Sequence, residues 1–100
     1  MSERIDQFFN GNLEGLQKSA VTFARLFAGL AMDPHGYFEK KYTARIENAT
    51  SESEIRGVLT QLLQWAISSD IAASERERLE HELDDHGLPS LDELRTHLLM

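Results

Sequence analysis

Apolar residues recur every three or four positions along most of the chain, and this spacing is typical of amphipathic helices. In the clearest case, between residues 13 and 32, one helical face would consist of Leu13, Leu16, Ala20, Phe23, Phe27 and Leu30. Val21, Ala24, Ala28 and Ala31 would form a second apolar strip beside it. The segment 52–67 has a similar wide face made of Ile55, Val58, Leu59, Leu62, Leu63 and Ala66. The pattern predicts helices and no strands.

Helix-capping signals divide this pattern into six segments. Capping boxes of the form S-x-x-E begin at Ser51, Ser74 and Ser90. Asp33 followed by Pro34 is typical of a helix start, Gly87 of a helix end, and Asp70 is an alternative cap to Ser74. These signals predict helices near residues 2–9, 13–32, 34–49, 52–67, 71–86 and 91–99.

The composition indicates a folded domain. With 100 residues, 41% apolar and 27% charged, the chain can bury enough surface to form one core. We therefore expect a single-domain, all-α, compact bundle of five to six helices over residues 1–100, with one or two strongly apolar helices at its centre.

The segment 20–32 is unusually apolar, because Thr22 and Arg25 are its only strongly polar residues. Either this helix lies at the centre of the bundle, or its second strip contacts another copy or a partner protein. The remaining helices are short or highly charged, which favours self-association as a homodimer. The interface predicted on this basis consists of Phe23, Ala24, Phe27, Ala28, Ala31 and Trp65.

The net charge of -7 is concentrated near the end of the chain. Residues 75–95 hold eight acidic and three basic side chains, a balance of -5, so the rest of the chain carries -2. This surface disfavours nucleic-acid binding and favours a protein partner with a basic face. The predicted acidic docking residues are Glu77, Glu80, Asp84 and Asp85.

Little in the sequence points to catalysis or to a bound metal. There is no cysteine, and three of the serines are explained as helix caps. In the string HELDDHG, residues 81–87, His81 lies one helical turn from Asp85, and Glu82 lies one turn from His86. Either pair would supply two ligands, which is too few for a tight metal site. We therefore predict no catalytic residue, no metal and no cofactor. The alternative is a small enzyme or ligand-binding bundle that uses His35, His81 or His86 with nearby carboxylates.

These observations favour a small, acidic, non-enzymatic protein that binds another protein, of the anti-activator, immunity, inhibitor or adaptor type. Glu3, Arg4 and Asp6 stand where a secretion signal would need an apolar core, and no apolar run is long enough to span a bilayer. The sequence therefore predicts a cytoplasmic protein without a membrane partner.

Overall fold

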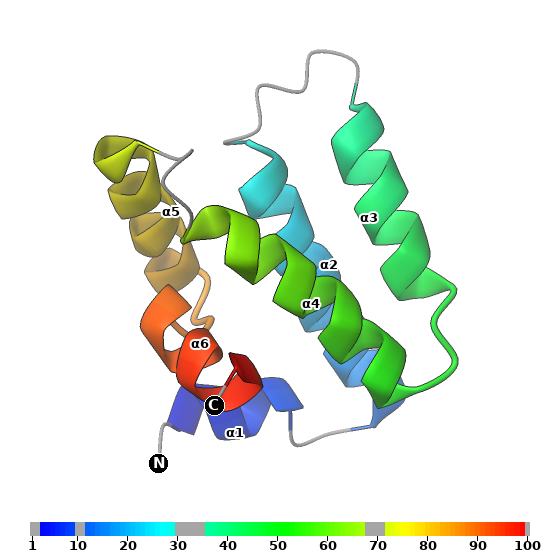
Figure 1. Ribbon diagram of the computed structural model, residues 1–100. Helices are drawn as coiled ribbons and strands as arrows, with labels where there is room; N and C mark the ends of the chain where they lie inside the picture. Colours follow the sequence, from blue (N-terminus) through cyan, green and yellow to red (C-terminus); the bar gives the residue numbers. More distant parts are fainter. Residues whose placement is uncertain (1–2, 10–11, 30–35, 68–71, 100) are drawn as a thin grey trace.

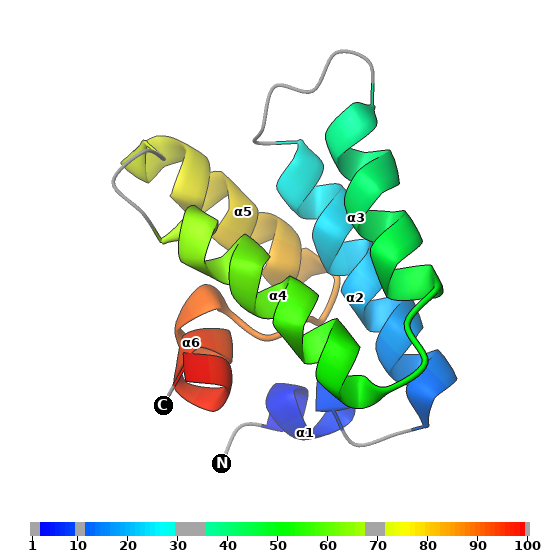
Figure 2. The same ribbon diagram turned by 45° about the vertical axis from the view of Figure 1, so that its right-hand side comes forward.

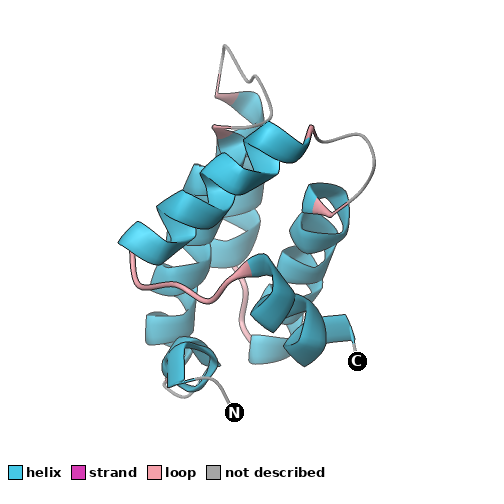
Figure 3. Ribbon diagram, turned by 90° about the vertical axis from the view of Figure 1, so that its left-hand side faces the viewer, coloured by secondary structure: helices cyan, strands magenta, loops and turns pink. Residues whose placement is uncertain are grey.

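The structure is a computed structural model of the chain, and it describes residues 3–9, 12–29, 36–67 and 72–99. Every regular element in these ranges is an α-helix, as Figure 3 shows. The helices, labelled in Figure 1, are α1 (Glu3–Phe9), α2 (Leu13–Ala28), α3 (Tyr37–Glu47), α4 (Glu52–Ala66), α5 (Ala73–Asp85) and α6 (Leu91–Leu99). The prediction of an all-helical bundle is confirmed for this part of the chain.

Three helices begin at polar caps, of which the sequence predicts two, Ser51 and Ser90. The side chain of Asn12 accepts the backbone N–H of Gly15 at 2.8 Å and starts α2. The Ser51 hydroxyl starts α4 by accepting the backbone N–H of Glu54 at 3.3 Å. The Glu54 carboxylate accepts the hydroxyl of Thr50 at 2.9 Å. Each cap satisfies an N–H that would otherwise lack a partner at the helix start.

The third cap, Ser90, forms a complete capping box at the start of α6. The backbone N–H of Glu93 donates to the Ser90 hydroxyl at 3.1 Å, and the N–H of Ser90 donates to the Glu93 carboxylate at 3.4 Å. These reciprocal bonds fix the direction in which the chain enters α6.

The end of α5 is a Schellman turn around Gly87. Gly87 has φ +70°, the left-handed conformation that glycine adopts without strain. The N–H of Gly87 donates to the carbonyl of Asp84 at 3.0 Å, and the N–H of Leu88 donates to the carbonyl of Leu83 at 2.8 Å. Leu83 and Leu88 are both buried, and an apolar contact between these two positions often accompanies this motif.

Two predicted helix starts are wrong. The third helix begins at Tyr37 and not at Pro34, because Gly36 has left-handed backbone with φ +70° and interrupts any continuous helix from 34. The fifth begins at Ala73 after Ala72, which makes no side-chain cap, so Ser74 lies inside the helix and does not cap it. Asp33, Pro34 and Asp70 lie outside the described residues.

Four helices pack against α2. Figures 1 and 2 show α2 and α3 running antiparallel, with α4 against both, while α1 and α6 lie together at one end of the bundle. Helix α2 contacts α1, α3, α4 and α5. The amide of Gln17 strengthens one of these contacts by donating to the carbonyls of Ile46 and Ala49 at 3.2 Å, where α3 ends.

The core is rich in aromatic side chains around Phe27. Its ring centroid lies 4.8 Å from that of Trp65, 5.7 Å from that of Phe38 and 6.1 Å from that of Phe23. Centroid separations of this size are favourable for aromatic pairs. Three helices, α2, α3 and α4, therefore share one aromatic cluster.

None of the described helices is long and apolar enough to cross a membrane.

Candidate functional site

The apolar residues predicted to form an interface lie mostly inside the chain. Phe23, Ala24 and Phe27 have no exposed surface, because α2 is covered by other helices of the same chain. Ala28 and Trp65 are half-buried, and Ala31 lies outside the described residues. Phe23, Ala24 and Phe27 therefore have no surface to offer a partner in this fold, and a docking surface has to be sought elsewhere.

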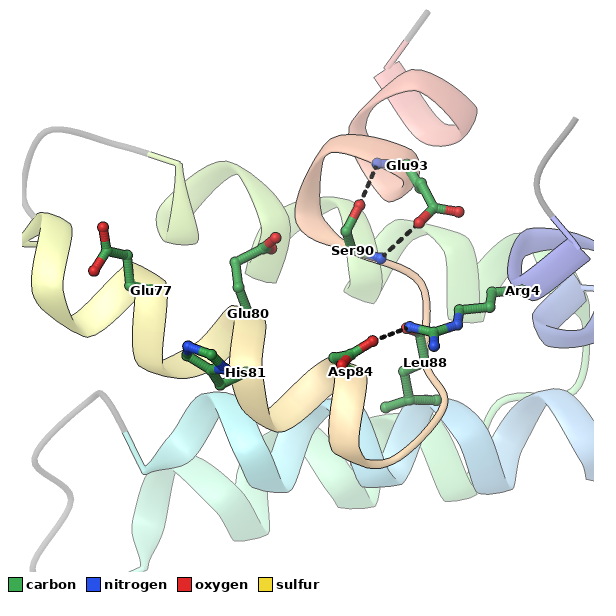
Figure 4. A pocket seen from close by; sticks show the side chains of 8 residues that line it. All are labelled: Arg4, Glu77, Glu80, His81, Asp84, Leu88, Ser90 and Glu93. Carbon is green, nitrogen blue, oxygen red and sulfur yellow. Dashed lines mark hydrogen bonds and ion pairs between the residues drawn. The ribbon is translucent and has the colours of Figure 1, made fainter.

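The predicted acidic residues, in contrast, gather on one surface. Glu77, Glu80 and Asp84 of α5 line a hollow of about 450 Å³. Figure 4 shows it together with the other lining residues, Arg4, His81, Leu88, Ser90 and Glu93. The hollow therefore holds four carboxylates and one guanidinium. Asp85 is exposed on the same helix, beyond the lining.

Two of these carboxylates are engaged at the start of α6. The carboxylate of Glu80, in α5, accepts the backbone N–H of Leu91 at 2.7 Å, and the carboxylate of Glu93 accepts the backbone N–H of Ser90. A negative charge at a helix N-terminus is favourable because the terminal N–H groups carry partial positive charge. Glu80 consequently holds α5 and α6 together in addition to contributing charge to the hollow.

A third carboxylate, Asp84, pairs with α1. The guanidinium of Arg4 lies 2.7 Å from the Asp84 carboxylate and also donates to the carbonyl of Leu88 at 3.4 Å. Because both side chains are well exposed, we expect this pair to contribute at most about 1 kcal/mol to stability. The sequence gives no indication of this contact, which joins residues 80 positions apart.

The remaining acidic residues of the prediction, Glu77 and Asp85, are exposed, and their side chains make no hydrogen bond or ion pair within the described residues. Glu77 also borders a second hollow, of about 390 Å³, between α4, α5 and α6. Its lining includes Ile67, which is 36% exposed, as well as Ala73 and Leu91. Acidic and apolar surface therefore lie next to each other here. We call Glu77, Glu80, Asp84 and Asp85, with Glu93, the acidic face.

The histidines belong to no group of three potential metal ligands in the part of the chain that the structure describes. His81 is exposed on α5, and in Figure 4 its ring lies apart from Ser90 and Glu93. Nδ1 of His86 donates to the carbonyl of Glu82 at 2.8 Å, near the end of α5. Within the described ranges no three potential ligands gather at one point, and His35 lies outside them.

His97, which the sequence analysis did not single out, is the more closely packed histidine. Its Nε2 lies 3.0 Å from the Arg56 guanidinium, and its ring centroid is 4.4 Å from that of Phe9. Because arginine only donates, Nε2 is the acceptor. Arg56 also lies over the Phe9 ring, at 4.7 Å. This contact joins side chains of α1, α4 and α6.

Comparisons with family models, curated proteins and solved structures found no match for this chain.

Proposed function

We propose that this chain is a small, non-enzymatic protein that binds another protein, and that its acidic face docks a basic surface on that partner. The observation that carries this proposal is the hollow beside α5, where four carboxylates accompany one guanidinium. Such an imbalance on one face raises the local concentration of cationic partners and speeds their association.

The second hollow gives the same surface an apolar component. Ile67, which is 36% exposed, lines this hollow together with Glu77 and Glu80, so a partner that contacts the two carboxylates would also meet an aliphatic side chain. Interfaces of this kind obtain affinity from a desolvated centre and orientation from the surrounding charges. A helix or loop with basic residues around an aliphatic side chain fits this arrangement best.

The acidic residues are not equivalent as sites for a test. Replacing Glu80 or Asp84 would also remove contacts to α6 or α1. Glu77 and Asp85 are exposed and hold no other element, so Glu77→Lys/Asp85→Lys is the variant that changes charge without changing packing. Lys18→Glu/Arg95→Glu, at exposed positions outside this face, serves as a control for altered charge.

A defined probe for the surface is a lysine-rich helical peptide with one central leucine. In a titration of isotope-labelled protein, we expect the amide resonances of Glu77, His81 and Asp85 to shift more than those of α3. A peptide with glutamate in place of lysine should leave them unchanged. Uniform small shifts over the whole chain would contradict a specific acidic docking face.

The natural partner can be sought with the same variants. Immobilised wild-type protein, Glu77→Lys/Asp85→Lys and the control variant would be exposed in parallel to lysate of the host cell. We expect a partner that the wild type and the control retain and that the acidic-face variant loses, with an association rate reduced about tenfold or more. Equal retention by all three would argue against the proposal.

A further inference from the structure

Helix α3 presents a basic surface that its own bundle leaves uncovered. Tyr37 is 72% exposed, and Lys40, Lys41, Ala44, Arg45 and Asn48 are exposed as well. Their spacings of three and four residues place them on one side of the helix. We call Lys40, Lys41 and Arg45 the basic face. They are three of the ten basic residues of a chain with a net charge of -7.

All three cations are exposed, although the Arg45 guanidinium donates to the Gln61 side chain of α4 at 3.0 Å. Two of them lie over the ring of Tyr42, with Lys41 Nζ 5.5 Å and Arg45 Cζ 5.7 Å from the ring centroid. The electron-rich face of an aromatic ring attracts cations at these distances. Glu39 faces Arg25 of α2 at 3.6 Å, on the other side of α3. The acidic residue at the border of the basic face is Glu47, which is exposed near the end of the helix.

The basic and acidic faces belong to opposite sides of the molecule. Figures 1 and 2 draw α3 and α5 at opposite sides, with α2 and α4 between them. Since α2 contacts both helices, the two faces of one chain are held apart and cannot neutralise each other. A second copy, however, can bring its acidic face to the basic face of the first.

We propose that the basic face of α3 docks on the acidic face of a second copy of this chain, in a head-to-tail contact. The proposal rests on the proposed function in one respect, since it uses the same acidic face. In a pair of copies joined in this way, one acidic face and one basic face remain unoccupied. Further copies can therefore add to the pair, and the assembly grows into a chain or closes as a ring and does not stop at a twofold dimer. Each contact covers an acidic face and thereby competes with a basic partner.

The test is sedimentation velocity of the full chain at two salt concentrations, with three variants. The basic-face variant is Lys40→Glu/Lys41→Glu, the acidic-face variant is Glu77→Lys/Asp85→Lys, and the control is Lys18→Glu/Arg95→Glu. The wild type and the control should associate at about 10 mM salt and dissociate at about 150 mM, because the screening length falls from about 30 to about 8 Å. Each face variant alone should dissociate at least about tenfold more readily.

Mixing the two face variants is the decisive step. The acidic-face variant then offers an intact basic face to the other variant's intact acidic face, so the mixture can form one contact that neither variant forms alone. Association restored only in the mixture supports the proposal and also shows that both variants fold. The variant Glu47→Gln, which removes the bordering acidic charge, should strengthen wild-type association.

Three outcomes would overturn the proposal. A wild-type monomer at low salt would do so, as would a complex that neither face variant weakens, since that complex must use other surfaces. Face variants that stay monomeric when mixed would also exclude charge pairing. If the chain is monomeric while the lysine-rich peptide still binds near Glu77, self-docking fails and the proposed function stands. If self-association behaves as expected and no basic probe or partner binds, the proposed function fails instead.

Discussion

Helices α2 and α5 contact each other but are held in the fold by different forces. Six of the 16 residues of α2 are buried, whereas α5 buries only Leu79 and Leu83 among 13. α5 makes up for this with polar contacts to the ends of its neighbours. Its arginines, Arg76 and Arg78, donate to the carbonyls of Ala66 and Gly29, where α4 and α2 end, at 3.1 and 3.3 Å.

This difference assigns the two helices different roles. Cations near helix C-termini and carboxylates near N-termini are favourable, so the polar side chains of α5 fasten α2, α4 and α6 together. A helix that is held by two leucines and by polar contacts to the ends of its neighbours keeps its outward side free for charge. The side of α2 that is rich in apolar residues is occupied by its own bundle. The partner-binding surface proposed for this chain therefore lies on its more polar helix.

The largest expected effect comes from removing the centre of the aromatic cluster. Phe27→Ala should lower the free energy of unfolding by about 3 to 5 kcal/mol, because a fully buried ring is lost and a cavity remains. Denaturant unfolding followed by circular dichroism measures this change. A loss below about 1 kcal/mol would contradict the burial of α2 within a single chain, and Tyr37→Ala, at an exposed ring, is the matched control.

A smaller and more local effect is expected in α5. Leu83→Ala removes one of the two buried side chains of this helix and should lower the free energy of unfolding by about 2 to 4 kcal/mol. Hydrogen exchange should show α5 opening before α2, since its amides depend on fewer apolar contacts. Equal protection of the amides of both helices in this variant would contradict the weaker apolar attachment of α5.

The polar attachment of α5 can be measured with two glutamates of the same helix. Glu80→Ala removes the acceptor of the Leu91 N–H and should cost about 1 kcal/mol of stability. Glu77→Ala removes an exposed carboxylate that holds no other element, and its effect should stay within about 0.5 kcal/mol. If both substitutions had the same effect, Glu80 would not act as a cap of α6.

The smallest effect on stability is expected from the variant that should change binding most. Glu77→Lys/Asp85→Lys should shift the free energy of unfolding by no more than about 0.5 kcal/mol, because both side chains are exposed. Thermal unfolding measures this directly. A large destabilisation would mean that these carboxylates support the fold, and loss of binding in this variant would then say nothing about docking.

Local features of the chain were predictable because their causes are local. Ser51 and Ser90 start helices as the capping boxes predict, and Gly87 ends α5. The misplaced starts of α3 and α5 show the limit of such signals. Ser74 with Glu77 has the spacing of a capping box, yet the helix already begins at Ala73, so the serine lies within its first turn.

The candidate site was predictable only in part. The sequence indicated the acidic residues of α5, because one helical segment carries them. Two of them, Glu80 and Asp84, are engaged in contacts with α6 and α1 that no local pattern indicates. The apolar residues around Phe23 were proposed as an interface, because the pattern alone does not say how many neighbours cover a helix.

The sequence by itself determined which segments are helical, where most of them are capped, and which helices are apolar or charged. These properties depend on residues within a few positions of one another. Only the tertiary structure decided which faces are covered, because burial depends on helices that are distant in the chain. It also placed Arg4 beside Asp84 and set the basic face of α3 and the acidic face of α5 on opposite sides of the bundle.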